Sequence, residues 1–441
     1  MQSTPGGGQI SDALPFLGVL LSVALLPIIA PRFWLRRTGF VACIWCAATL
    51  APLALRSGIA AAASQAWHAV LVDYLPFISL LVVLYATGGG VLIRGGPWGT
   101  PAGNTLLLAL GTVLAGLVGT TGAAMTLIHP FLRSNAHRTR KVHLAVFFIA
   151  LVANAGGATS PLGGPPLYLG YLRGVPFFWP VRHLAGPLAL LTALLLAGFY
   201  LLDRRLAARD RPPPPRERVH LRGWLNIGLL ASTVAAVLAE SAWHPGPIAL
   251  FGEAIDLQLV VSVALFSAIT AVSVRLTPRA IRGANMFDWE PMQEVAKLFL
   301  AVFITIQPVI GLLHAGLAGR AAPLLRLTLG PDGTPVAAPM FWLSGGLSAF
   351  LDNAPTYLVF FELAGGDPAA LTSHLGHVLI ALSAGSMFFG GLTYIGNAPN
   401  LLIRTIASHR GVRMPSFFGY MAWSCMLLLP AYLLLTALFF R

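Results

Sequence analysis

The sequence predicts an all-α polytopic membrane protein with about ten transmembrane helices and two re-entrant hairpins, arranged in two inverted repeats. Its 441 residues are 56% hydrophobic and only 10% charged, and the mean hydropathy is +0.77. Too few polar side chains remain to cover a water-soluble globule of this size, so much of the surface must face lipid. The other two observations are a series of apolar runs of spanning length and a set of apolar segments interrupted by Gly, Pro, Asn and Asp.

Eight apolar runs are uninterrupted and are expected to form simple spanning helices. They cover residues 13–30, 40–55, 70–93, 184–202, 224–239, 257–274, 296–313 and 417–440. The segment before the first run has no basic n-region, and no small-residue cleavage site follows the run. We therefore expect residues 1–37 to form an N-terminal anchor helix.

Four more apolar segments are interrupted. Residues 143–174 and 374–404 carry dense Gly, Pro and Asn at their centres, which predicts two broken helices. Residues 104–132 are split by Gly119-Thr120-Thr121-Gly122, and residues 336–362 by Asp352-Asn353-Ala354-Pro355. Each half of these last two is judged too short to span, so both segments are predicted to be re-entrant hairpins.

The formal charge of +13 comes from short basic clusters between apolar runs, and no basic domain separates out. Positive-inside loops explain this pattern better than nucleic-acid binding, so no nucleic-acid partner is expected. All clusters fall on one side if both hairpins return to the side they entered. That side is then the cytoplasm, both termini lie outside, and residues 203–222, with Pro212 to Pro215, form a solvated cytoplasmic linker. Residues 204–256 would hold this linker and one extra helix.

Residues 38–203 and 257–441 follow the same membrane path in opposite directions, which is the arrangement of many secondary transporters. Residues 156–167 align without gaps with residues 390–401, so that Thr159 matches Thr393 and Pro165 matches Pro399. Matches of this kind on equivalent elements favour an internal repeat.

A broken helix exposes backbone N–H and C=O groups, which a bilayer tolerates only where a ligand or water satisfies them. The breaks and hairpin tips therefore predict the binding site. Half-helix N-termini suit an anion, while unwound carbonyls and Asn side chains suit a cation. The candidates in the first half are Thr120, Thr121, Gly122, Asn154, Gly156, Gly157, Thr159, Ser160, Gly163 and Pro165. Those in the second half are Asp352, Asn353, Ala354, Pro355, Thr356, Thr393, Gly396, Asn397, Pro399 and Asn400.

Asp352 is the strongest single candidate for a functional residue, as a sodium ligand or a proton carrier, because a carboxylate at membrane depth must be protonated, paired or bound to a cation. The structural alternative is that Asp352 caps the second arm of its hairpin, and the two roles are compatible. Asp73 and Glu362 are expected to be interfacial, with Asp73 at a helix start. Glu290, Glu294 and Lys297 follow helical spacing and are expected to form a surface ion-pair patch. The three cysteines predict neither disulfides nor a zinc site.

Three motifs in order resemble the ion transporter superfamily, and most of all its citrate transporter branch, whose members are often labelled sodium:proton antiporters. The motifs are Asn154 to Gly170, Leu351 to Thr356, and Gly396 to Asn400. The resemblance runs from about residue 40 to the C-terminus and extends to the related divalent anion:sodium symporters. It implies a scaffold domain, a transport domain, elevator-type alternating access and a homodimer.

Residue by residue, the resemblance implies one cation site at Thr120, Thr121 and Asn154, and a symmetry mate at Asp352, Asn353, Thr356 and Asn397. The anion would lie between the hairpin tips. One departure concerns the coupling ion, because this chain has Gly164 where the family commonly has Asp.

The leading hypothesis is therefore Na⁺- or H⁺-coupled symport of citrate or a similar carboxylate across the plasma membrane, with no cofactor beyond the coupling ion. Four half-helix starts can hold carboxylates, and no arginine sits at the motif centres. Sodium/proton antiport without an organic substrate is the alternative, and a passive channel fits the broken helices less well. No catalytic set of paired aspartates, Ser with His, or His-Glu-x-x-His is found, so an enzyme is not expected.

Overall fold

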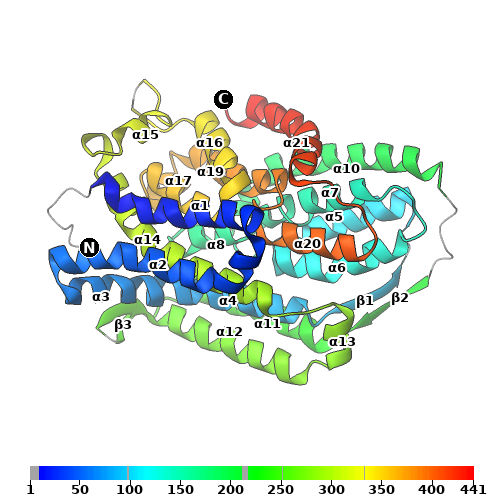
Figure 1. Ribbon diagram of the computed structural model, residues 1–441, viewed down its shortest axis with the longest axis horizontal. Helices are drawn as coiled ribbons and strands as arrows, with labels where there is room; N and C mark the ends of the chain where they lie inside the picture. The colour runs from blue at the N-terminus through cyan, green and yellow to red at the C-terminus, as the bar shows by residue number, and fades with distance from the viewer. Residues whose placement is uncertain (1–8, 97–98, 211–216, 251, 332) are drawn as a thin grey trace.

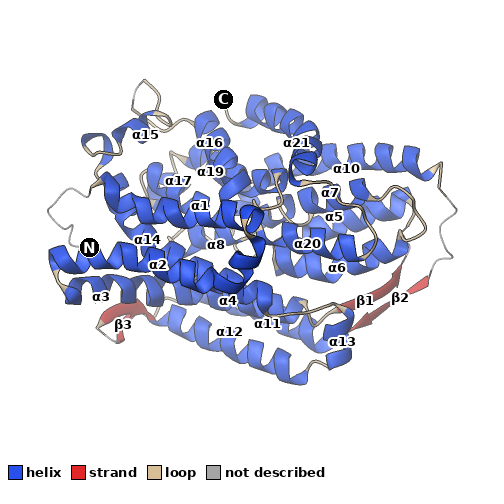
Figure 2. Ribbon diagram, in the orientation of Figure 1, coloured by secondary structure: helices blue, strands red, loops and turns tan. Residues whose placement is uncertain are grey.

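The computed structural model describes residues 9–96, 99–210, 217–250, 252–331 and 333–441. Helices dominate it, and most of the long ones run along the longest axis of the molecule (Figures 1 and 2). Within the described residues, ten helical stretches are long and apolar enough to cross a membrane. The prediction of an all-α polytopic membrane protein is confirmed. Pro212 to Pro215 of the predicted linker lie outside the described residues.

The continuous helices are formed by the uninterrupted apolar runs. They are α1 (Leu14–Ile29), α2 (Pro31–Ser57), α3 (Ile59–His68), α4 (Leu75–Gly88), α10 (Ala185–Ala207), α11 (Trp224–Ala242), α12 (Leu257–Leu276), α14 (Glu290–His314) and α21 (Phe417–Phe439). A π-helical turn at Ala69–Tyr74 joins α3 to α4, which makes one long stretch. The predicted boundary between anchor and first repeat, at residue 37, falls inside α2.

The interrupted segments break where Gly, Pro, Asn and Asp predicted a break. The two predicted hairpins are α5 (Pro101–Val118) with α6 (Thr120–Ser134), and α16 (Ala337–Leu351) with α17 (Asn353–Leu363). The first broken helix comprises α7 (Val142–Leu151), the 3-10 turn η3 (Ala155–Thr159) and α8 (Pro165–Leu172). The second comprises α19 (Gly376–Phe388), the 3-10 turn η5 (Phe389–Leu392) and α20 (Ala398–His409).

Short elements complete the chain. The helical ones are η1 (Ile10–Ala13), α9 (Trp179–His183), α13 (Arg279–Ala284), η4 (Gly316–Ala318), α15 (Ala322–Arg326) and α18 (Pro368–Thr372). Two antiparallel strand pairs join β1 (Leu92–Gly96) to β2 (Glu217–Arg222) and β3 (Pro247–Leu250) to β4 (Glu253–Asp256).

The helices form two groups. The peripheral bundle comprises α1–α4, α11, α12 and α14, and the interrupted bundle comprises α5–α8, α10, α16, α17 and α19–α21. The two groups meet where α4 contacts α6 and α8, and where α14 contacts α17. Of the residues in the most apolar 18-residue part of each stretch, 89% are buried in Val142–Thr159 but only 17% in Leu257–Leu276. Protein therefore encloses the first broken helix, as its freed backbone groups require.

One arm of the first hairpin is longer than predicted. The 18 residues of α5, Pro101–Val118, are long and apolar enough to span by themselves. The expectation that each hairpin half is too short is therefore wrong for this arm. The re-entrant path itself stays a prediction.

Both ends of the helix predicted at 70–93 lie closer to the N-terminus than expected. It begins at Ile59 and ends at Gly88, and Leu92–Gly96 is a strand. The helix ends within Gly88-Gly89-Gly90, where other segments approach the backbone too closely for a side chain. A β-carbon on Gly89 would lie 2.2 Å from the Phe287 ring, and one on Gly90 would lie 2.3 Å from the Asn226 amide.

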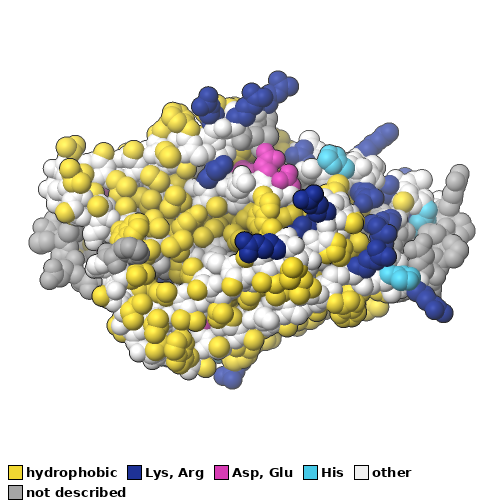
Figure 3. Space-filling view, turned by 90° about the horizontal axis from the view of Figure 1, so that it is seen from below, with side chains coloured by type: hydrophobic (Ala, Val, Ile, Leu, Met, Phe, Trp, Pro, Cys, Tyr) yellow, Lys and Arg dark blue, Asp and Glu magenta, His cyan; other side chains and the backbone are white. Residues whose placement is uncertain are grey.

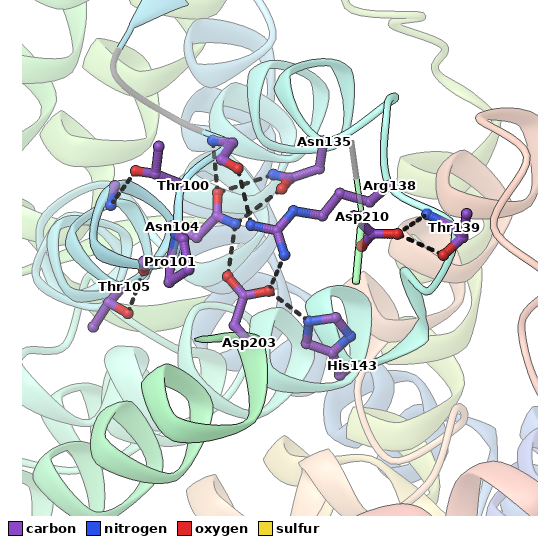
Figure 4. Close-up of polar contacts among 12 residues, drawn as sticks. Thr100, Pro101, Asn104, Thr105, Asn135, Arg138, Thr139, His143, Asp203 and Asp210 are labelled. Atoms are coloured by element: carbon purple, nitrogen blue, oxygen red, sulfur yellow. Dashed lines mark hydrogen bonds and ion pairs between the residues drawn. The ribbon is translucent and has the colours of Figure 1, made fainter. Parts of the chain in front are cut away.

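Both described ends of the segment predicted as a solvated linker, residues 203–210 and 217–222, contain regular structure. Helix α10 continues to Ala207, and β2 pairs with β1. Asp203 is fully buried, and its carboxylate accepts hydrogen bonds from Arg138 (2.6 Å), His143 (2.9 Å) and Asn104 (3.0 Å) (Figure 4). Asn104 and Asn135 also exchange two side-chain hydrogen bonds of 2.9 Å. This network ties the base of the α5–α6 pair to α7 and α10.

Two expectations about charged residues are also wrong. Glu294 accepts a hydrogen bond from the indole of Trp34, and Glu290, Glu294 and Lys297 form no ion pair among the described residues. Packing of α2 on α14 supplies the partner that the sequence could not. Asp73 lies inside the long α3–α4 stretch and not at a helix start. The side chain of Gln307 donates a hydrogen bond to its carboxylate at 2.9 Å.

Hydrophobic side chains dominate the face in Figure 3, and Lys, Arg and His gather mostly toward the end that carries β1 and β2. The clustering agrees with basic loops that lie at one membrane surface. Cys43, Cys46 and Cys425 are free thiols.

Candidate functional site

A cavity lies between the two bundles, at the point where all four interruptions meet. Helices α4 and α14 form its apolar wall, and the interrupted bundle forms the opposite wall. Its lining residues are Leu80, Leu81, Leu84, Tyr85, Gly119, Thr120, Thr121, Gly122, Pro161, Leu162, Gly163, Gly164, Pro165, Tyr168, Pro291, Met292, Val295, Phe299, Asp352, Asn397, Ala398, Pro399 and Leu402. The cavity is therefore lined by eight of the candidates, namely Thr120, Thr121, Gly122, Gly163, Pro165, Asp352, Asn397 and Pro399.

Four helices begin at or beside this cavity. They are α6 at Thr120, α8 at Pro165, α17 at Asn353 and α20 at Ala398. The N-terminus of a helix carries unpaired N–H groups and the positive end of the helix dipole. Four such ends make the cavity favourable for an anion without a cationic side chain.

Gly119 forms the tip of the first hairpin, in a backbone conformation with φ of +82° that favours glycine. The backbone N–H of Thr120 then donates to the carbonyl oxygen of Gly163 at 2.9 Å. This bond fixes the tip to the first broken helix. Close packing adds to it, because a β-carbon on Gly88 of α4 would lie 2.8 Å from the Cα of Gly122.

Thr159 and Ser160 hold the first break against α5. The hydroxyl of Ser160 donates to the carbonyl oxygen of Gly116 at 2.5 Å and accepts from the N–H of Leu162 at 3.2 Å. A β-carbon on Gly116 would overlap the hydroxyl of Thr159. Both residues therefore support the break and lie outside the cavity lining.

Asp352 forms the tip of the second hairpin, with φ of +72°. One carboxylate oxygen accepts from the N–H of Ala354 at 3.2 Å, and the hydroxyl of Thr356 donates to the Asp352 carbonyl at 2.9 Å. Asp352 is thus both the cap of α17 and part of the cavity lining. No Lys, Arg or His among the described residues forms an ion pair with it.

Three asparagines bind the two broken helices together. Asn154 donates to the side-chain oxygen of Asn400 at 2.9 Å, and Asn397 donates to that of Asn154 at 3.2 Å. Asn400 in turn donates to the carbonyl oxygens of Gly390 and Thr393, at 2.7 and 2.9 Å. Asn154 therefore lies with Asn397 and Asn400 of the second half.

Asn353 differs from these asparagines. It is 1% exposed, and neither its amide oxygen nor its amide nitrogen has a hydrogen-bond partner in the described part of the protein. A buried amide left unpaired costs about 1–3 kcal/mol, so such groups occur where something else binds them. Its oxygen points to the space beside Gly390, which Asn154 also faces.

The two halves correspond, but one residue out of register with the predicted alignment. Ser160 and Thr393 play the same part, because Thr393 donates to the carbonyl of Ala349 and accepts from the N–H of Ile395 at 3.2 Å. A β-carbon on Gly163 would collide with the carbonyl oxygen of Gly157, and one on Gly396 with that of Gly390.

Thr393 therefore corresponds to Ser160 and not to Thr159, and Gly390 corresponds to Gly157 and not to Gly156. The predicted alignment maximised identical letters, whereas the backbone contacts define a register one residue away. In this register Gly119 matches Asp352, Thr120 matches Asn353, and Gly164 matches Asn397.

The remaining candidates shape the breaks. Pro355 and Thr356 belong to the first turn of α17, and Gly157, Gly396 and Asn400 lie in the two break loops or at the start of α20, outside the cavity lining. Sequence reasoning missed the apolar wall, including Leu84, Met292 and Phe299. Apolar residues in a spanning helix carry no signal that separates a cavity wall from a lipid-facing surface.

These features define a polytopic membrane protein whose interrupted helices surround an interior cavity. A family model described as "Putative citrate transport" matches residues 8–440. The chain belongs to this family of transporters. The match confirms the family predicted from the three motifs and begins earlier than the predicted residue 40, so it includes the N-terminal helix. No curated protein matches the chain in a sequence search.

Proposed function

We propose that the protein is a secondary transporter that carries citrate or a similar carboxylate, coupled to Na⁺ or H⁺, by alternating access. The observation that carries this proposal is the cavity in which four helix N-termini and the carboxylate of Asp352 face a single apolar wall. Membership of a citrate transport family supports the substrate class.

The cavity suits a carboxylate because the positive dipole ends of four helices meet there, and N–H groups at helix starts without a protein partner can replace the water that the anion loses. Pro165 and Pro166 of α8 have no N–H, and the N–H of Thr120 is bonded to Gly163, so these two helices contribute mainly through their dipoles. Thr120 and Thr121 add hydroxyl groups at the first tip. Small glycines at the tips and breaks allow the anion to approach the backbone.

Asp352 provides a physical reason for coupling. Two negative charges within about 4 Å repel each other strongly in a medium of low dielectric constant. A carboxylate substrate can therefore share the cavity with Asp352 only when Asp352 is protonated or a cation lies beside it. Asn353, Thr356 and Asn397 of the second half lie next to Asp352 in the chain or in the cavity lining and would complete a cation site.

The division of the cavity wall supports an elevator-type movement. Every polar group named above belongs to the interrupted bundle, while α4 and α14 contribute mostly apolar side chains. Such a wall makes few directional bonds, so the interrupted bundle can slide along it with its cargo. We place the protein in the plasma membrane with residues 203–222 cytoplasmic and both termini outside, because its basic loops gather toward one end. We also propose a homodimer, which the resemblance to the ion transporter superfamily implies.

The test uses the full chain in proteoliposomes with labelled citrate. We expect citrate to accumulate against its gradient only when an inward Na⁺ or H⁺ gradient is imposed. Asp352→Asn should abolish this accumulation, whereas Glu253→Gln, which alters a carboxylate on β4 that contacts His68, should leave it unchanged. Citrate flux that does not depend on a cation gradient would overturn the proposal in favour of a channel.

Sodium/proton antiport without an organic substrate is the second candidate, because Asp352 is the only carboxylate that the described residues contribute to the cavity lining. One carboxylate that alternates between a proton and Na⁺ would suffice for exchange. Internal pH changes that follow a Na⁺ gradient without any carboxylate present would favour this candidate.

A further inference from the structure

Gly157 and Gly390 occupy equivalent positions in the two break loops, yet their surroundings differ in chemistry. A β-carbon on Gly390 would lie 2.6 Å from the side-chain oxygen of Asn154 and 2.7 Å from that of Asn353. The carbonyl oxygen of Gly396 lies 3.1 Å from the same point. Three oxygens from three different segments thus converge beside Gly390.

The same three positions surround Gly157, but two of them present carbon. A β-carbon on Gly157 would lie 2.7 Å from the terminal methyl of Met387, 2.8 Å from the γ-methyl of Thr120 and 2.8 Å from the carbonyl oxygen of Gly163. In the register set by Ser160 and Thr393, Met387 corresponds to Asn154 and Thr120 to Asn353. Equivalent residues therefore surround Gly157 and Gly390. Two side-chain oxygens face the space beside Gly390, whereas two methyl groups face the space beside Gly157.

A neighbouring pair shows the same asymmetry. Gly164 corresponds to Asn397, whose amide donates to the side-chain oxygen of Asn154 at 3.2 Å. A β-carbon on Gly164 would lie 2.5 Å from the terminal methyl of Met387 and 3.1 Å from its sulfur. Met387 therefore fills the volume that a side chain at residue 164 would need.

Hard cations such as Na⁺ take oxygen ligands, and neither a methyl group nor a thioether replaces water around them. The group of oxygens beside Gly390 includes an amide that is buried and has no protein partner, which points to a ligand. Of the three atoms nearest to a β-carbon on Gly157, one is a carbonyl oxygen and two are methyl carbons.

We propose that the protein holds a single coupling metal cation, beside Gly390, and that Met387 excludes a second one from the equivalent position beside Gly157. This inference rests on the proposed function, because it assigns the coupling site of that transport. One metal cation would accompany each transport cycle at this pair of positions.

The experiment measures binding of radioactive Na⁺ to the purified full-length chain by equilibrium dialysis. We expect one Na⁺ per chain and a Hill coefficient near one. Asn154→Leu should abolish binding, whereas Met387→Leu, at the equivalent position of the other half, should leave it unchanged. Asn353→Leu serves as a second loss variant, because its amide makes no hydrogen bond among the described residues that folding would miss.

Binding of two Na⁺ per chain, loss of binding in Met387→Leu, or binding retained in both asparagine variants would each overturn the inference. The triple variant Thr120→Asn, Gly164→Asn, Met387→Asn gives the space beside Gly157 asparagines at the positions equivalent to Asn353, Asn397 and Asn154, and its Na⁺ capacity should rise toward two per chain. Citrate uptake distinguishes this inference from the proposed function. Proton-driven uptake with no bound Na⁺ refutes only the inference, and one bound Na⁺ without any citrate uptake refutes only the proposed function.

Discussion

Gly119 and Asp352 hold the same backbone conformation at the tips of the two hairpins, with φ and ψ of 82° and 148° at Gly119 and 72° and 148° at Asp352. Only glycine adopts this region without strain, and another residue there costs about 1–3 kcal/mol. A strained aspartate at the position where the other repeat has glycine indicates that a carboxylate is needed at that point.

Asp352→Gly should therefore make the protein more stable and less active. Removing the side chain relieves the backbone strain, which we expect to raise the free energy of unfolding by about 1 kcal/mol after loss of the cap to Ala354. Coupled uptake should disappear, because no carboxylate remains in the cavity. Thermal denaturation in detergent and proteoliposome uptake measure the two effects.

Gly119→Ala is the matched control, since it introduces the strain that Asp352→Gly removes. Its β-carbon would lie 3.3 Å from the carbonyl oxygen of Leu162, so we expect a loss of about 1–3 kcal/mol. If Asp352→Gly proved as destabilising as Gly119→Ala, strain at Asp352 would not be part of the site.

The four interruptions could be predicted because Gly, Pro and Asn within an apolar run have a local meaning. The partners of the polar residues could not. Asn154 reaches Asn400, which is far away in sequence, and only the packing of the two broken helices brings them together. The position of Met387 beside Gly157 and Gly164 could not be predicted either, because a methionine in an apolar helix is most often an ordinary core residue.

Errors at the edges of elements have similar causes. Apolar letters continue to Ile93 although three glycines end the helix at Gly88. Asp203 opens a run of charged residues, so its sequence context predicts a solvated side chain, whereas α10 continues to Ala207 and turns Asp203 toward Arg138. Composition indicates where a run becomes polar, but not which polar residue faces inward.

Asn353→Leu should stabilise the protein when Na⁺ is absent. The substitution removes a buried amide without partners in favour of an apolar side chain of similar size, which we expect to gain about 1–2 kcal/mol. Na⁺ stabilises a protein that binds it by mass action, so the variant should also lose the Na⁺-dependent rise in melting temperature. Thermal scans with Na⁺ and with choline separate the two effects. An unchanged Na⁺-dependent shift would remove Asn353 from the cation site.

Asp203→Asn should destabilise the protein strongly, because it leaves the buried charge of Arg138 without its counter-charge. Breaking one partner of a buried ion pair costs about 3–5 kcal/mol. The control is Asp210→Asn, where the carboxylate accepts hydrogen bonds from Thr139 in an exposed position and the expected loss is about 0.5 kcal/mol. Equal melting temperatures for the two variants would mean that the hydrogen bonds and ion pairs around Asp203, drawn in Figure 4, add no stability.

Arg173 links the two bundles on a side of the cavity that the transport proposal leaves unused. At the end of α8, its guanidinium lies 3.6 Å from Asp73 of the peripheral bundle and 3.4 Å from Glu362 of α17. Glu362 in turn accepts from His314 of α14 at 2.8 Å. Two of these three contacts join the bundles, so sliding of one bundle past the other must break them.

Arg173→Gln should therefore reduce the population of the arrangement in which these ion pairs join the two bundles. It should also speed exchange with the arrangement in which the interrupted bundle has slid along the peripheral bundle. Partly exposed ion pairs contribute about 0.2–1 kcal/mol each, which limits the expected change to about fivefold. Distances between spin labels on α4 and α20 measure the populations, and Arg182→Gln, on α9 outside these ion pairs, serves as the control. If the distance distributions of Arg173→Gln and Arg182→Gln coincide, the ion pairs do not hold the bundles in this arrangement, and the apolar wall alone sets their relative position.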